Sequence, residues 1–153
     1  MKTLIVGLGN EILTDDAVGL YVVRELKKRG NDINVTIVEA SLAGLGLVDM
    51  LVGYEKIIVV DAIQTKSGQA GQIHRLNSDD LSSTRHTAST HNVNFASALE
   101  LGRTLGLAIP KNIVIFAIEA EDFHTFREEC TPSVRKAIPR CAKMIVREIS
   151  NKQ

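Results

Sequence analysis

Short apolar runs alternate with longer amphipathic segments along the chain, which is the pattern of strands and helices arranged as β-α-β units. Five runs have the length and composition of strands: 3–6, 35–38, 57–60, 72–76 and 112–118. Four segments have apolar residues at helical spacing: 16–29, 42–52, 91–105 and 132–149. This order predicts an α/β fold, a three-layer sandwich in which helices cover both faces of a twisted, mostly parallel sheet of about five strands.

The length and charge of the chain exclude several classes of protein. Its 153 residues have the usual length of one domain and show no linker or repeat, so we expect residues 1–153 to form a single domain. The 18 Lys and Arg balance the 18 Asp and Glu, whereas nucleic-acid binders cluster positive charge. No apolar run approaches the roughly 20 residues that span a bilayer, and the chain opens on a strand pattern instead of a signal peptide. We therefore expect a cytoplasmic protein that binds neither nucleic acid nor membrane.

A glycine turn at 7–9 follows the first predicted strand and precedes a helix, as in dinucleotide-binding folds. That fingerprint requires a third small residue where this chain has Ile12, and the helix then opens with Asp15 and Asp16, where an anionic phosphate would sit. Glu39 ends the second strand, where a ribose-binding acid belongs. A nucleotide-binding module without catalysis is therefore one alternative, and tight packing of strand against helix explains the same glycines.

Three potential metal ligands follow elements that end at one edge of the predicted sheet. Asp16 comes after the first strand, Asp61 directly follows the apolar run of the third strand, and His91 begins a helix. Two carboxylates and one imidazole suit Zn, Ni, Fe or Mn and leave coordination positions open for a substrate or water. These residues also have structural explanations, because Asp15 or Asp16 can cap a helix and complement its dipole. A divalent-metal hydrolase or phosphatase is a second alternative.

Other polar and reactive side chains are expected to have structural roles. Glu119, Glu121 and Asp122 follow the last strand, where we expect a solvated loop. Cys130 and Cys141 flank or lie on one helix, where their eleven-residue separation corresponds to about 16 Å of rise. That distance exceeds the reach of a disulfide, so we expect two reduced thiols.

The motifs of this chain resemble those of the [NiFe]-hydrogenase maturation proteases. The N-terminal signature of that family resembles two segments, LIVGLGN at 4–10 and LTDDAVG at 13–19. The resemblance continues through four shorter motifs: LAG at 42–44, IVVDA at 58–62, STH at 89–91 and TPSV at 131–134. It therefore covers nearly the whole chain.

This resemblance implies a function and a set of site residues. The function is that of an endopeptidase that removes the C-terminal extension of a [NiFe]-hydrogenase large-subunit precursor after nickel insertion, with nickel in the substrate as the recognition mark. By position, Asp16, Asp61 and His91 would be the nickel ligands. Asp16 and Asp61 are also candidates for the catalytic acid and base, in keeping with an aspartyl-type protease. The residues implied in substrate binding are Gly9, Asn10 and Gly44.

The resemblance leaves two roles open for nickel, and this chain departs from the family pattern at two positions. Nickel either serves only as a recognition mark or also polarises the scissile carbonyl as a Lewis acid. The family commonly has an aspartate where this chain has Glu39 and a threonine where it has Leu42. Both departures concern the turn that the resemblance implies in orienting the substrate.

Overall fold

The computed structural model of the chain describes residues 2–30, 34–41, 45–78 and 90–151. Its five strands are β1 (Thr3–Leu8), β2 (Val35–Ala40), β3 (Lys56–Ile63), β4 (Ile73–Asn77) and β5 (Asn112–Glu119). Its helices are a short 3₁₀ helix η1 (Thr14–Ala17), α1 (Val18–Lys28), α2 (Leu45–Leu51), α3 (Thr90–Thr104) and α4 (Pro132–Ser150). None of the helices in these ranges is long and apolar enough to cross a membrane.

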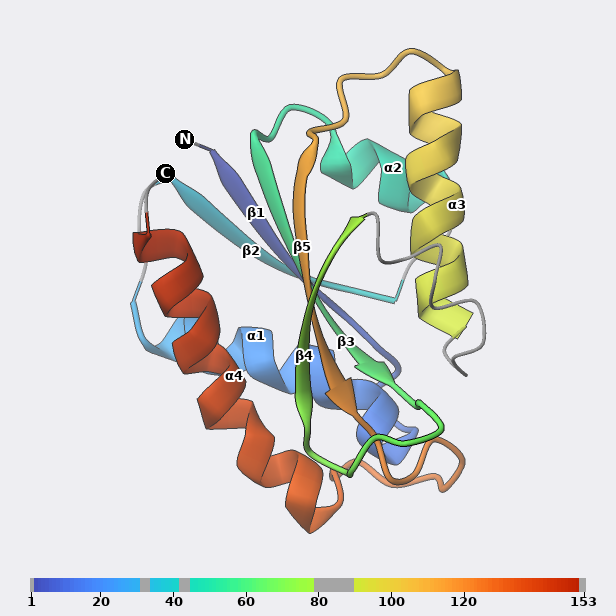
Figure 1. Cartoon of the computed structure of the whole chain (residues 1–153), viewed down its shortest axis with the longest axis vertical. Helices are drawn as coiled ribbons and strands as arrows, with labels where there is room; N and C mark the ends of the chain where they lie inside the picture. The colour runs from blue at the N-terminus through green and yellow to red at the C-terminus, as the bar shows by residue number, and fades with distance from the viewer. Residues whose placement is uncertain (1, 31–33, 42–44, 79–89, 152–153) are drawn as a thin grey trace.

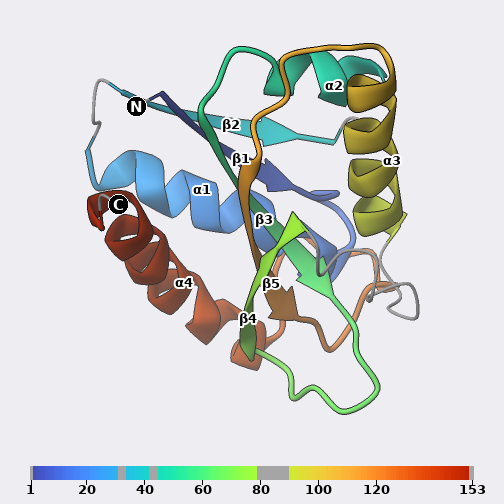
Figure 2. The same cartoon turned by 45° about the horizontal axis from the view of Figure 1, so that its top comes forward.

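The strands form one sheet in the order β2-β1-β3-β5-β4. The pairs β1–β2, β1–β3 and β3–β5 are parallel, and only the edge strand β4 runs antiparallel to its neighbour. Figure 1 and Figure 2 show α1 and α4 on one face of the sheet and α2 and α3 on the other. The predicted α/β fold, with a mostly parallel sheet of five strands between two helical layers, is therefore confirmed.

Alternate side chains of β3 enter two separate cores. Ile58 and Val60 pack with α1 and α4, whereas Ile57, Val59 and Ile63 pack with α2 and α3. Because strand side chains alternate between faces, the residue at 61 belongs to the face that α2 and α3 cover. Both faces of the central strand are buried, which explains its nearly continuous apolar sequence.

Several predicted boundaries are wrong in detail. The third strand was predicted at 57–60 but extends to Ile63, since it pairs with β5 along its whole length. The helix predicted at 16–29 begins instead as the 3₁₀ helix η1, and α1 starts at Val18. The first three residues of the helix predicted at 42–52 lie outside the described residues.

The start of α1 lies against the carboxyl ends of β1 and β3 with no room for a side chain. A Cβ atom added at Gly19 would lie 2.3 Å from the carbonyl oxygen of Val60 and 2.5 Å from that of Leu8. One added at Gly7 would lie 2.4 Å from the carbonyl oxygen of Gly19. Glycine at 7 and 19 therefore lets the strands and the helix touch through their backbones.

We predict that Gly19→Ala lowers the free energy of unfolding by about 3 kcal/mol or more, because two backbone carbonyls must move to admit the methyl group. The matched variant is Gly30→Ala, where an added Cβ meets nothing within 4 Å and only the positive φ of 107° costs energy, about 1 to 2 kcal/mol. Urea unfolding of both variants measures the difference. Equal losses in the two variants would contradict the close approach.

Candidate active site at the carboxyl ends of β1 and β3

Two of the three predicted ligands, Asp16 and Asp61, come from elements that contact one another. Asp16 lies in η1, which contacts β3, and Asp61 lies within β3 opposite Ala117 of β5. His91 is the second residue of α3, whose first turn lies toward the end of the sheet where β1 and β3 finish (Figures 1 and 2). The side chain of His91 is outside the described part of the structure, so its contact with the two aspartates stays a prediction.

The two aspartates have different surroundings. Asp61 is fully buried, and its Oδ1 accepts a hydrogen bond of 2.8 Å from the backbone amide of Ala62. Asp16 is half-buried, and its Oδ2 accepts a hydrogen bond of 3.1 Å from the backbone amide of Asn10. The side chain of Asp16 can therefore be reached from solvent, whereas that of Asp61 cannot.

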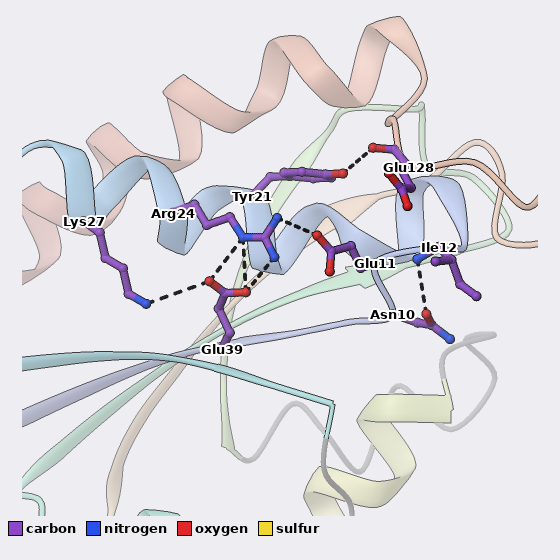
Figure 3. Close-up of polar contacts among 8 residues, drawn as sticks. All are labelled: Asn10, Glu11, Ile12, Tyr21, Arg24, Lys27, Glu39 and Glu128. Carbon is purple, nitrogen blue, oxygen red and sulfur yellow. Dashed lines mark hydrogen bonds and ion pairs between the residues drawn. The ribbon is translucent and has the colours of Figure 1, made fainter.

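A compact turn holds the carboxylate of Asp16 in place. The backbone amide of Asn10 donates to Asp16, and the side-chain oxygen of Asn10 accepts a hydrogen bond of 3.3 Å from the amide of Ile12 (Figure 3). A Cβ atom at Gly9 would lie 2.4 Å from the carbonyl oxygen of Asp16. Gly9 and Asn10 thus shape the turn around Asp16, and their contact with a substrate stays a prediction. Gly44, the third predicted substrate residue, lies outside the described residues.

Asp15 is a buried structural residue and caps no helix. Its carboxylate accepts hydrogen bonds from the amides of Glu121 at 2.9 Å, Asp122 at 3.0 Å and Thr131 at 2.7 Å. The Thr131 hydroxyl donates to the same carboxylate at 2.8 Å, so this residue, although at the N-cap position of α4, makes no side-chain cap bond. The alternative in which Asp15 caps a helix is therefore wrong. Asp15 instead joins η1 to the loop after β5.

Glu119 lies at the end of β5 in an environment that the sequence analysis did not predict. It is buried, with a hydrogen bond of 3.1 Å from the amide of Thr65, a second from the Thr65 hydroxyl, and a contact of 3.2 Å between its Oε1 and Nε2 of His74. The solvated-loop prediction is thus wrong for Glu119, although Glu121 is exposed as expected. The signal was available in β5 itself, because position 119 continues the alternation of the buried residues at 113, 115 and 117.

Asp122, in the loop after β5, stays ionised through local hydrogen bonds. The hydroxyl and amide of Thr125 and the amide of His124 lower the pKa of Asp122 to about 2. The carboxylate is half-buried, and it fixes the course of the loop just before the residues at 126–129. This part of the loop is therefore ordered by a charged side chain at neutral pH.

The carboxylate of Glu39 is bound by cations of α1. Arg24 donates to Glu39 at 2.8 Å and also pairs with Glu11 at 3.1 Å, while Lys27 lies 3.8 Å from Glu39 (Figure 3). The Arg24 hydrogen bond lowers the pKa of Glu39. The acid at the end of β2 is thus part of a surface ion-pair network, which counts against its use in binding a ribose.

The two cysteines are free and buried, as predicted. Burial raises the pKa of both Cys130 and Cys141 to about 12, so the thiols are protonated at neutral pH. A thiol in that state is a poor nucleophile. Neither cysteine is therefore suited to act as a nucleophile.

The site as described combines an accessible carboxylate, a buried carboxylate and the first turn of a helix that carries a histidine. Within the described side chains, no three His, Cys, Asp or Glu residues gather closely enough to hold a metal ion. The predicted set includes His91, so it remains a prediction. The two carboxylates and one imidazole of that set are donor types that would suit a borderline divalent metal. The fold and site define a small α/β protein with an acidic site at the carboxyl ends of its central strands.

Comparison with known proteins places this arrangement in a family. The sequence pattern of the family described as hydrogenase maturation protease matches residues 20–148. The chain belongs to this family of peptidases.

Its relatives and structural neighbours agree with this assignment. Hydrogenase 2 maturation protease of Escherichia coli is 26% identical over 148 residues, which cover 95% of this chain and 89% of the relative. Hydrogenase expression/formation protein HupD of Bradyrhizobium diazoefficiens is 29% identical over 142 residues, 90% of this chain and 72% of the relative. The structure of the hydrogenase maturating endopeptidase HybD from E. coli superposes with a TM-score of 0.88 at 25% identity, covering 98% of this chain and 93% of that one.

We predict that Asp15→Ala lowers the free energy of unfolding by at least about 3 kcal/mol, because three backbone amides and a hydroxyl lose their acceptor in a buried position. Asp49→Ala, on the exposed side of α2, is the matched control and should change stability by less than about 0.5 kcal/mol. Chemical denaturation followed by circular dichroism compares them. If both variants unfold at the wild-type midpoint, Asp15 does not join the two segments.

Proposed function

We propose that this protein is the endopeptidase that removes the C-terminal extension from the precursor of a [NiFe]-hydrogenase large subunit after nickel has been inserted. Membership of the hydrogenase maturation protease family supports the reaction class. The observation that supports the proposal for the site is that η1, which carries the half-buried Asp16, contacts β3, which carries the buried Asp61.

The nickel ion belongs to the substrate in this proposal and acts as its recognition mark. Asp16, Asp61 and His91 supply two carboxylates and one imidazole, a set that leaves coordination positions for the ligands that the substrate already provides. A protease with an incomplete ligand set gains affinity only for a precursor that brings the metal. Cleavage thereby becomes dependent on completed nickel insertion.

The carboxylates have separate roles in hydrolysis. Peptide hydrolysis forms a bond between the water oxygen and the carbonyl carbon and breaks the bond from that carbon to nitrogen, with one proton passing to the leaving amine. Asp16, reached by solvent and oriented by the amide of Asn10, is suited to accept the proton from water. Asp61, buried and oriented by the amide of Ala62, is suited to position the substrate group that enters the site.

The first test is the intact mass of a nickel-loaded large-subunit precursor before and after incubation with this protein. We expect the loss of one peptide-sized mass in the nickel-loaded sample and none in a nickel-free control. No loss in either sample would contradict the proposed function. Equal loss in both would contradict the role of nickel as the recognition mark.

The second test concerns the three proposed site residues. We expect Asp16→Asn, Asp61→Asn and His91→Ala each to lower the cleavage rate at least 100-fold, because each removes a ligand or a proton-transfer group. Asp49→Asn on the exposed side of α2 is the control and should cleave at the wild-type rate. Circular dichroism checks that each variant is folded. A folded Asp61→Asn protein that cleaves normally would exclude both proposed roles of that residue.

A further inference from the structure

The loop after β5 exposes a large aromatic side chain beside the candidate site. Phe126 is 79% exposed and Ile12 is 46% exposed, although most other large apolar residues of the described chain are buried. Both line an open hollow of about 780 Å³ together with Arg127, Glu128 and Glu129. An exposed aromatic next to an exposed aliphatic side chain is typical of a protein-binding surface. These five residues are called the Phe126 surface below.

The backbone beneath the Phe126 surface is held by hydrogen bonds. The amide of Arg127 donates to the carbonyl of Ile12 at 2.9 Å, and the amide of Thr14 donates to the carbonyl of Arg127 at 3.0 Å. The Tyr21 hydroxyl binds the carbonyl of Glu128 (Figure 3). Phe126 is therefore presented by a fixed loop, which reduces the entropy lost when a partner binds.

The Phe126 surface is continuous with the candidate active site. Ile12 donates its amide to the side chain of Asn10, and the amide of Asn10 in turn binds the carboxylate of Asp16. Only one short turn separates the exposed apolar residues from the accessible aspartate. A chain that occupies the active site must therefore pass beside this surface or rest on it.

Charged side chains of both signs border the apolar part of the surface. Glu11 pairs with Arg24 at 3.1 Å, and Glu129 pairs with Arg135 of α4 at 3.3 Å. Arg127 and Glu128 bring one charge of each sign into the hollow. An apolar centre with a polar rim of balanced charge is suited to bind an apolar side chain of a partner.

We propose that the Phe126 surface is the docking site for the large-subunit precursor, which binds it through an apolar side chain. This inference rests on the proposed function, because the partner is the substrate of that reaction. It assigns recognition of the protein chain to residues at 12 and 126–129, separate from the residues proposed to sense nickel. Affinity for the precursor then depends on apolar contact as well as on the metal.

The test compares steady-state cleavage of the nickel-loaded precursor by the wild type and by Phe126→Ala. We expect KM to rise at least tenfold while kcat stays within about twofold, because docking is lost and the reacting groups are intact. Leu105→Ala is the matched control, because Leu105 is 56% exposed and directly follows Thr104, the last residue of α3. Figure 1 shows the last turn of α3 at the end of the sheet away from the loop after β5. The control variant should keep the wild-type KM.

A second apolar variant tests the surface independently. We expect Ile12→Ala to raise KM as well, because it removes apolar contact area beside Phe126, whereas Val146→Ala on the exposed side of α4 leaves KM unchanged. Cleavage by the wild type with an unchanged KM in both Phe126→Ala and Ile12→Ala would overturn the docking site and leave the proposed function standing. Failure of the wild type to cleave the precursor would overturn both.

Discussion

The buried carboxylate of Asp15 joins two segments that are 106 to 116 residues apart in the chain. Three amides and a hydroxyl donate to it, so the turn before α1 and the loop after β5 behave as one structural unit. A buried charge is tolerated only with such compensation. Asp16 and Phe126 both lie on this unit, which means that the proposed catalytic carboxylate and the proposed docking residue depend on the same interaction for their relative position.

The glycines near the site allow two backbones to touch, so a nucleotide-binding loop is not required to explain them. Gly7 and Gly19 face each other across β1 and α1, and Gly19 also meets the carbonyl of Val60. A phosphate-binding loop would keep its amides free for an anion. Here the amide of Asn10 binds Asp16, a carboxylate of the protein itself. The same local sequence therefore builds an acidic site where a dinucleotide fold builds an anion-binding one.

The alternation of apolar runs was sufficient to predict the α/β fold, because parallel strands buried on both faces leave a strong signal such as that of 57–60. The partners of individual polar side chains left no local signal. Asp15 looked like a helix cap because its partners lie more than one hundred residues away. The alternation of β5 could have predicted the burial of Glu119, but not its partners Thr65 and His74, which lie 54 and 45 residues earlier in the chain. The geometry of parallel sheets was sufficient to predict Asp16 and Asp61 near the carboxyl ends of the strands. Their unequal burial could not be predicted, because it depends on how η1 packs on β3.

Unequal burial gives two identical side chains different chemical capacities. Asp61 is enclosed on the face that α2 and α3 cover, so its position is set by the core and varies little. Asp16 is fixed by the turn at 9–16, and that turn also carries Ile12 of the Phe126 surface. The same short turn therefore carries part of the proposed docking surface and orients the Asp16 carboxylate. A precursor that rests on the surface is thus held at a fixed distance from the reactive carboxylate, and no movement of the sheet is needed.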